Sequence, residues 1–333
     1  MDKDFAIVRS DIESSLKYYL DRAGMYYRIF SRSKDNMSIK KKLDEKGEEY
    51  RREGKKMQDL IGVRVVFYFP DDVRIFHNKL KELDGYDPQN ESNSTRELRD
   101  LSNVINAMDD EQTNAKKELK KLLPFHDKVF MPERLNVVMS MSEPNAALVR
   151  MELEGQHEYD SSLIDMTYEV QLRTVLSEGW HEVEHDLRYK TRKESWWDYC
   201  QEESRMLNGL YATLETSEGA LSRMIEEVTY KNYQNRSWDA MIRFHFRRRT
   251  NGAKLSKSLC DALDNDERMA KEILHVGREE MARWLWEIGP SAPITTDLLF
   301  SLINRKVLKN VELMKLESQP VRSVLDKSGI GIG

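Results

Sequence analysis

The sequence predicts an α+β protein, with a mixed β-sheet flanked by helices and an all-α region at its C-terminal end. Up to about residue 230, short stretches rich in β-branched and aromatic residues lie among longer, charged stretches with helical periodicity. After residue 237 only the helical periodicity remains. We therefore expect two domains, 1–230 and 238–333, separated by a polar segment at 231–237. The second would be a regulatory or partner-binding domain.

The first expected elements are helices over residues 1–30, with apolar residues near one face, and 36–53, which is highly charged. A strand is expected over 60–69, because this stretch is rich in β-branched and aromatic residues and ends before Pro70. Asp71 and Asp72 then predict the start of a helix that reaches Leu83.

The middle of the chain alternates between polar and apolar stretches. The expected elements are a polar loop over 86–98, a helix over 99–123, a strand over 129–141 interrupted at Pro132, a polar hairpin near 154–157, a strand over 166–173, and helices over 174–190 and 200–230. On the last of these helices we expect an apolar stripe made of Leu207, Leu210, Leu214, Leu221 and Met224. Residues 238–325 are expected to be helical, with a break at 289–293.

Composition excludes several classes of protein. The chain has 333 residues and a net charge of −5, so its overall field does not indicate a nucleic-acid binder. No apolar run approaches the length of a membrane span, and the N-terminus has no signal-peptide pattern. Cys200 and Cys260 are far apart and lack the spacing of a disulfide framework or a zinc site. We expect a cytoplasmic protein.

The strand over 166–173 carries an ordered polar face. Tyr168, Val170 and Leu172 alternate with Glu169, Gln171 and Arg173, which is the period-2 pattern of a half-buried strand. A carboxylate, an amide and a guanidinium on one face can together orient a hydroxyl, a metal ion and a phosphate. The pattern therefore predicts a functional site on this strand, although a solvated edge strand is the alternative.

Two upstream clusters add cations and an acid. The segment from Arg32 through Lys34 and Ser38 to Lys42 places cations and a serine at the start of a helix, which suits phosphate. A solvated basic face is the alternative. Asp59 opens a buried strand, where a carboxylate can hold Mg²⁺ beside substrate phosphates. Arg64 lies on that strand and needs a partner or a ligand, and a structural Asp59–Arg64 ion pair is the alternative.

The helix after the strand contains His181-Glu182-Val183-Glu184-His185, which fits the zinc motif H-E-x-x-H. No third ligand is evident in the sequence, and helices rich in Glu and His produce this string by chance. A zinc hydrolase is therefore an alternative that we place behind phosphate chemistry.

Taken together, four motifs resemble the synthetase domain of the RelA/SpoT family. They are R-x-K-x-x-x-S-I-x-x-K-L at 32–43, D-x-x-G-x-R at 59–64, E-x-Q-x-R-T at 169–174 and W-x-x-x-E-H-x-x-x-Y-K at 180–190. The resemblance covers residues 10–230 and implies a short synthetase with a nucleotidyltransferase-like sheet. It also implies transfer of the β,γ-pyrophosphate of ATP to a ribose 3′-hydroxyl. In the family, this hydroxyl belongs to GDP or GTP.

The resemblance also implies roles for individual residues. Arg32 and Arg64 would sandwich the adenine, while Lys34, Ser38 and Lys42 would hold the ATP phosphates. Asp59 and Glu169 would bind Mg²⁺, and Glu169 would also be the general base. Further residues complete the set: Gln171 and Arg173 would position acceptor and phosphates, with His185, Tyr189 and Lys190 as supports or phosphate contacts.

The chain departs from the family pattern before its last strand. Family members have a K-x-x-G-Y-x-S-x-H loop whose Tyr stacks on the acceptor guanine, whereas residues 130–138 contain no Gly-Tyr pair and place Leu135-Asn136 where Leu-His is usual. The acceptor therefore stays open. The alternatives are a toxin that pyrophosphorylates the 3′ end of tRNA or another nucleotide, and a catalytically silent nucleotide sensor.

Three further expectations concern partners. The strip 243–249 mixes four cations with aromatic residues and could face nucleic acid, although an amphipathic helix with Phe side chains in the core and Arg side chains in solvent is the preferred interpretation. The C-terminal domain could bind a protein partner. Short synthetases of this family often assemble, which allows a homo-oligomer.

Overall fold

The computed structural model describes residues 5–46, 49–50, 54–93, 135–155, 158–185, 187, 200–288 and 293–331. Two compact units make up the chain: unit 1 comprises Met1–Ser14 and Tyr27–Glu218, and unit 2 comprises Ser15–Tyr26 and Gly219–Gly333. This division falls within helix α8 (Gln201–Gln234). A domain boundary at 231–237 stays a prediction. Within the described ranges, no helix is long and apolar enough to cross a membrane.

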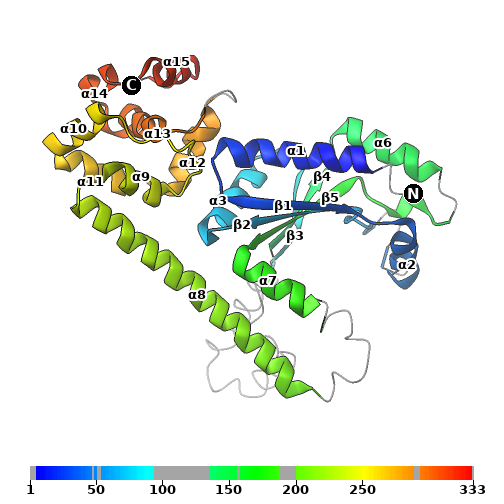
Figure 1. Cartoon of the computed structure of the whole chain (residues 1–333). Helices are drawn as coiled ribbons and strands as arrows, with labels where there is room; N and C mark the ends of the chain where they lie inside the picture. Colours follow the sequence, from blue (N-terminus) through cyan, green and yellow to red (C-terminus); the bar gives the residue numbers. More distant parts are fainter. Residues whose placement is uncertain are drawn as a thin grey trace, which may run out of the picture. The chain divides into compact units, whose positions relative to one another are not determined.

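Unit 1 is built on a five-stranded mixed sheet with the strand order β1-β2-β5-β4-β3 (Figure 1). The strands are β1 (Tyr27–Ser33), β2 (Ile61–Phe67), β5 (Thr167–Thr174), β4 (Leu135–Ser140) and β3 (Tyr86–Asn93). Only the β2–β5 pair among them is parallel; the other neighbours are antiparallel. A mixed sheet with flanking helices, followed by a helical C-terminal region, confirms the predicted fold class.

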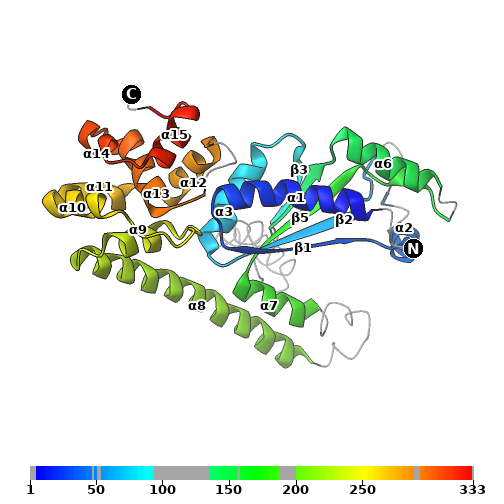
Figure 2. The same ribbon diagram turned by 45° about the horizontal axis from the view of Figure 1, so that its top comes forward.

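Helices cover the two faces of this sheet differently. Helix α6 (Glu143–Glu154) and the part of α1 (Ala6–Arg22) that belongs to unit 1 lie on one side, and α7 (Val175–Glu184) lies on the other (Figures 1 and 2). Two hydrogen bonds define the first side: Ser31 Oγ of β1 donates to Glu13 Oε2 at 2.6 Å, and Asn145 Nδ2 of α6 donates to Asp11 Oδ2 at 2.7 Å. The polar face of β5 is therefore turned toward α7.

Most elements of unit 1 lie where the sequence predicts them. Helix α2 (Asn36–Lys46) follows β1, α3 (Pro70–Lys81) follows β2, and α7 and α8 follow β5. Residues 94–134, which include the helix expected over 99–123 and the break at Pro132, lie outside the described residues. The later part of the strand expected over 129–141 is confirmed as β4.

Three expectations for the part of the chain before β5 are wrong. The helix expected over 1–30 ends at Arg22, and Gly24 at φ +60° turns the chain into β1. The loop expected over 86–98 begins as β3, because pairing with β4 overrides its polar composition. The segment before residues 154–157 is helix α6, whose buried face is formed by Ala146, Val149 and Leu153.

The apolar stripe predicted on α8 is also wrong in part. Leu210 and Met224 are exposed, at 60% and 52% of their surface. Buried positions on this helix are instead Asn208, Tyr211, Ile225, Thr229 and Tyr233. Tyr211 and Ile225 are 14 residues apart, which is close to four helical turns, so they lie on the same side of the helix.

Unit 2 is helical, as predicted. After α8 come α9 (Trp238–Phe246), α10 (Lys257–Asn265), α11 (Glu267–His275), α12 (Arg278–Glu287), α13 (Thr296–Ile303), a π-helical turn (Asn304–Leu308), α14 (Val311–Lys315) and α15 (Gln319–Lys327). In the basic strip, Phe246, Arg247 and Arg248 are buried, and Arg243 pairs with Asp239 at 2.9 Å. Phe244 is 42% exposed, so the preferred interpretation is confirmed for Phe246 and is wrong for Phe244, Arg247 and Arg248.

A buried arginine ties the end of unit 2 together. Arg305, 1% exposed, donates from Nε and Nη2 to the two oxygens of Glu317 at 2.9 and 2.5 Å. Its Nη1 donates to Asp326 Oδ1 at 2.6 Å and to the carbonyl of Ile330 at 2.7 Å. The guanidinium thus joins the π-helical turn to the segment between α14 and α15, to α15 itself and to the residues that follow it.

We expect Glu317→Ala to destabilise the protein by about 3–5 kcal/mol, because it leaves a buried guanidinium without its bidentate partner. Urea unfolding followed by circular dichroism measures the loss. Glu312→Ala is the matched control: Glu312 pairs with Lys315 on the exposed surface at 2.7 Å, where an ion pair contributes little. Equal midpoints for the two variants would contradict the role given to Glu317.

Candidate functional site

Adjacent strands bring the predicted site residues together on the face of the sheet that is turned toward α7. Along β5, Glu169 and Gln171 point to this face because side chains alternate. Across the sheet, Gly62 of β2 is the register partner of both Glu169 and Arg32, and Arg64 is the partner of Gln171. Gly62 leaves an open position between Arg32 and Glu169, and a Cβ there would meet nothing within 4 Å.

Asp59 is the centre of a cation cluster just before β2. The backbone N–H of Lys34 donates to the carbonyl of Leu60 at 2.9 Å, which extends the β1–β2 ladder and brings Lys34 beside Asp59. Asp59 Oδ2 lies 3.2 Å from Lys34 Nζ and 2.6 Å from Lys42 Nζ. The alternative of a structural Asp59–Arg64 ion pair is therefore wrong, because Lys34 and Lys42 are the partners of Asp59.

These lysines control the ionisation of Asp59. Burial by itself raises the pKa of the Asp59 carboxyl, but the hydrogen bond from Lys42 and the charge of Lys34 outweigh burial and hold that pKa below its usual value. Burial likewise lowers the pKa of the Lys42 ammonium, and its hydrogen bond to Asp59 raises that pKa above the usual value. Asp59 is therefore ionised at neutral pH and Lys42 is charged.

A small hollow joins this cluster to β5. Its volume is about 70 Å³, and it is lined by Arg32, Lys34, Asp59, Leu60, Gly62, Glu169 and Gln171. A drug-sized ligand fills several hundred Å³, so the hollow has room for only part of such a molecule. Its lining combines the cationic side chains of Arg32 and Lys34 with the Glu169 carboxylate and the Gln171 amide.

Asp59 has one oxygen that fits a metal ion. Its Oδ1 is buried and makes no hydrogen bond within the described part of the chain, although both lysines bind Oδ2. A buried carboxylate oxygen without a donor is costly, and Mg²⁺ takes one or two carboxylates together with substrate phosphates. Asp59 and Glu169 line the same hollow, so this pair fits Mg²⁺.

Arg64 is bound to helix α7. Its Nη1 donates to Glu178 Oε1 at 2.5 Å and also to Glu182 Oε1, and its Nε donates to Gln171 Oε1 at 3.1 Å. Burial lowers the pKa of the guanidinium, but the hydrogen bonds and charges of Glu178 and Glu182 raise it above its usual value. Arg64, which lies on β2, therefore connects this strand to β5 and to α7 by hydrogen bonds.

Arg173 is buried, and hydrogen bonds hold its guanidinium against β4 and β5. Its Nη1 donates to the carbonyls of Leu135 at 3.1 Å and Leu172 at 2.8 Å, while Nη2 donates to Asn136 Oδ1 at 2.8 Å. Asn136 is the register partner of Gln171 on β4. These contacts fasten β4 to β5 beside the site, and they account for a guanidinium on the third polar position of β5.

The start of α2 differs from the expected phosphate cradle. Arg32 lies on β1, Lys34 follows that strand, and the backbone N–H of Ser38 donates to Asp35 Oδ1 at 2.7 Å. This bond from the Ser38 backbone lowers the pKa of Asp35. A carboxylate thus already caps the helix terminus, and the groups that can attract phosphate are cationic side chains, among them Arg32, Lys34 and Lys42.

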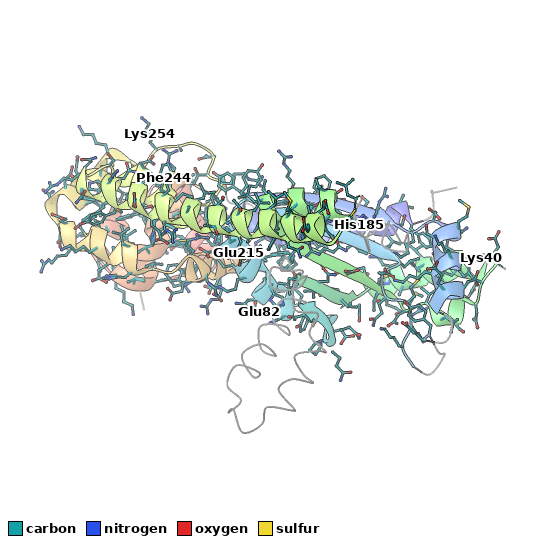
Figure 3. The ribbon with its side chains drawn as sticks, turned by 90° about the horizontal axis from the view of Figure 1, so that it is seen from below. Lys40, Glu82, His185, Glu215, Phe244 and Lys254 are labelled. Carbon is teal, nitrogen blue, oxygen red and sulfur yellow. The ribbon has the colours of Figure 1, made fainter. Side chains whose placement is uncertain are left out.

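The last motif is described only in part. His185 is exposed at the end of α7, and in Figure 3 it lies well away from Lys40 on α2. His181 is buried and packs edge-on against Trp180 at 5.4 Å. Tyr189 and Lys190 lie outside the described residues. In the described ranges no group of three or more His, Cys, Asp or Glu side chains is placed to hold a metal.

Three residues at this site were not predicted from the sequence. Glu178 and Glu182, one turn apart on α7, both bind Arg64; their i,i+4 spacing directly after the polar strand was the available signal. Phe30 is the register partner of Arg64 on β1 and is 54% exposed. An aromatic residue in a predicted helix gave no signal, because β1 itself was not predicted.

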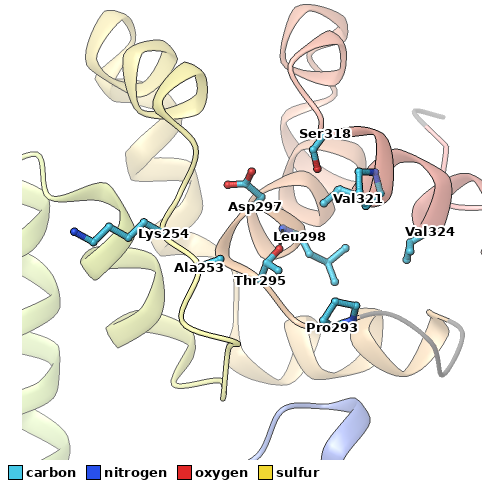
Figure 4. A pocket seen from close by; sticks show the side chains of 10 residues that line it. Ala253, Lys254, Pro293, Thr295, Asp297, Leu298, Ser318, Val321 and Val324 are labelled. Carbon is cyan, nitrogen blue, oxygen red and sulfur yellow. Dashed lines mark hydrogen bonds between the residues drawn. The ribbon is translucent and has the colours of Figure 1, made fainter.

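Unit 2 has a hollow of its own, of about 270 Å³ (Figure 4). It is formed by the segment before α10, the start of α13 and the start of α15. Leu298, Val321 and Val324 contribute aliphatic side chains, and Lys254 and Asp297 contribute charge. None of the residues predicted from the four motifs lines it.

The parallel strands β2 and β5, with a cation-bound aspartate just before β2 and a polar face on β5, define an α+β domain with a charged hollow on its sheet. Residues 31–194 match the family model of the region found in RelA and SpoT proteins. The chain therefore carries a RelA/SpoT-family domain, which confirms the resemblance.

Several solved structures are similar to this chain. A GTP pyrophosphokinase family protein from Streptococcus pneumoniae is 17% identical, with 66% of this chain and 88% of that chain covered and a TM-score of 0.41. Small alarmone synthetase 1 from Bacillus subtilis, bound to its product pppGpp, is 16% identical, with coverage of 68% and 95% and a TM-score of 0.43. Small alarmone synthetase 2 from the same organism is 16% identical, with coverage of 66% and 94% and a TM-score of 0.40. No curated protein sequence matches the chain significantly.

Proposed function

We propose that this protein is an ATP-dependent pyrophosphokinase that transfers the β,γ-pyrophosphate of ATP to the 3′-hydroxyl of GDP or GTP. One observation carries the proposal: a single hollow joins Asp59, with its two lysines, to Glu169 and Gln171. Such transfer needs aligned reactants and cations around the phosphoryl oxygens more than it needs covalent catalysis.

The cations of the site would hold ATP. Arg32, Lys34 and Lys42 supply three positive charges around Asp59, which favours a polyphosphate. Asp59 and Glu169 would hold Mg²⁺, which neutralises charge on the transferring phosphates when bound. Lys34 and Lys42 keep Asp59 ionised for that role.

Glu169 would act as the general base. Its carboxylate accepts the proton of the 3′-hydroxyl, and the hydroxyl oxygen forms a bond to the β-phosphorus of ATP. The bond between that phosphorus and the α,β-bridging oxygen breaks, and AMP leaves with the electron pair. Gln171 donates from Nε2 to Glu169 Oε1 at 3.3 Å and so orients the base.

A tRNA acceptor is the second candidate, and one observation favours it. Residues 130–138 have no Gly-Tyr pair to stack on a guanine. At the described end of that stretch, Asn136 binds Arg173. Chemistry at Asp59 and Glu169 would be the same for either acceptor.

The test is incubation with γ-labelled ATP and a panel of acceptors: GDP, GTP, ADP, ATP and deacylated tRNA. We expect label in guanosine tetraphosphate or pentaphosphate. Label in tRNA would replace the first acceptor with the second. ATP binding without label in any acceptor would contradict transfer and indicate a nucleotide sensor.

A further inference from the structure

Two carboxylates of α7 take no part in the transfer proposed above, yet both are bound to the site. Glu178 Oε1 and Glu182 Oε1 accept hydrogen bonds from the same nitrogen of Arg64. Glu178 is largely buried, and Glu182 is 62% exposed. Hydrogen bonds between ionised groups are about twice as strong as neutral ones, so α7 holds the Arg64 guanidinium in place.

Arg64 in turn determines how the Gln171 amide is oriented. Arg64 Nε donates to Gln171 Oε1 at 3.1 Å. A guanidinium can only donate, so the amide oxygen must face Arg64 and the amide nitrogen must face the other way. That nitrogen donates to Glu169 Oε1 at 3.3 Å. A continuous series of hydrogen bonds therefore runs from α7 to the proposed base.

Helix α7 is itself well fixed. Thr174 and Ser177 form a reciprocal capping box at its first turn. Trp180 Nε1 donates to the carbonyl of Leu207 at 2.9 Å, and its ring packs edge-on against Tyr211 at 5.1 Å. Both contacts lie within unit 1. The helix that carries Glu178 and Glu182 is therefore anchored by its capping box and by the contacts of Trp180.

We infer that Glu178 and Glu182 are positioning residues that orient Glu169 through Arg64 and Gln171. This inference rests on the proposed function. It gives Arg64 a role in the rate of transfer, separate from the stacking on adenine that family resemblance implies. Loss of stacking would raise KM for ATP, whereas loss of positioning lowers kcat.

The test compares kcat and KM for ATP in Glu178→Ala, Glu182→Ala and Arg64→Lys. We expect kcat to fall about 10- to 100-fold in Glu178→Ala and less in Glu182→Ala, with KM for ATP within about threefold, because the reacting base is misplaced. Arg64→Lys keeps the charge but lacks the Nε donor to Gln171, so its kcat falls as well. All three residues act through the same series of hydrogen bonds. The loss of kcat in the double variant Glu178→Ala, Arg64→Lys, expressed as a free energy, should therefore be smaller than the sum of the losses in the two single variants.

The matched control is Glu143→Ala, which removes a glutamate from an exposed ion pair with Arg150 at 2.7 Å in the same unit. Wild-type kcat in both Glu182→Ala and Glu178→Ala would overturn the inference, as would additive effects with Arg64→Lys. Because Glu182 is exposed, its variant tests the inference even if Glu178→Ala does not fold. No label transfer by the wild-type protein would overturn the proposed function, and this inference with it.

Discussion

Glu169→Gln should abolish pyrophosphate transfer and leave ATP binding largely intact. The substitution keeps the size of the side chain and its place beside Gln171, but removes the group that accepts the hydroxyl proton. Loss of a positioned general base costs about 10²- to 10⁴-fold in rate. Label transfer measures the loss, and titration calorimetry with ATP measures binding.

The control for this variant is Glu143→Gln, the same substitution at an exposed ion pair of unit 1. It should transfer label at the wild-type rate. Unchanged turnover in Glu169→Gln would remove Glu169 from the mechanism. A parallel loss of ATP binding and of turnover would instead make Glu169 a binding residue, with the base to be found elsewhere.

Asp59→Asn should also lose activity, by roughly 100-fold at fixed Mg²⁺, because electrostatic stabilisation of the transferring phosphates weakens. Two consequences combine. The ammonium groups of Lys34 and Lys42, both bound to Asp59 Oδ2, lose their counter-charge and repel each other. The buried Oδ1, which fits a metal ion, is lost as an anionic ligand.

A magnesium titration separates these two consequences. Additional Mg²⁺ should restore Asp59→Asn only in part, because metal saturation does not replace the carboxylate between the lysines. Asp44→Asn is the control: Asp44 is an exposed carboxylate on α2, the helix that carries Lys42. Full recovery at high Mg²⁺ would mean that Asp59 acts only as a metal ligand, and wild-type activity throughout would contradict any role.

Several features of the site could be predicted from the residues alone. The alternation along β5 gives the shared face of Glu169 and Gln171, since the two-residue period of a strand is a property of the backbone. The buried strand β2 was equally clear from its composition. The order of the four motifs predicted the RelA/SpoT-family domain, and the family model over 31–194 confirms it.

Other features needed the folded chain. Strand β1 was hidden at the end of a segment with helical periodicity, and only its pairing with β2 places Arg32 beside Gly62. The partners of charged residues were also unpredictable: Asp59 took two lysines in place of Arg64, and Arg64 took two glutamates more than 110 positions away in the chain. Sequence spacing does not determine which long side chains meet across elements.

The sequence by itself therefore determined the chemistry that this protein carries: an acid before a buried strand, cations upstream, and a polar strand face. Those properties are local, because strand periodicity and residue type are fixed before the chain folds. Only the tertiary structure decided how the groups are connected, with lysines holding Asp59 and α7 holding Arg64. Ion pairs form between the charged side chains that the packed sheet and helices bring close together. The distance between two such side chains depends on the fold and not on their spacing in the sequence.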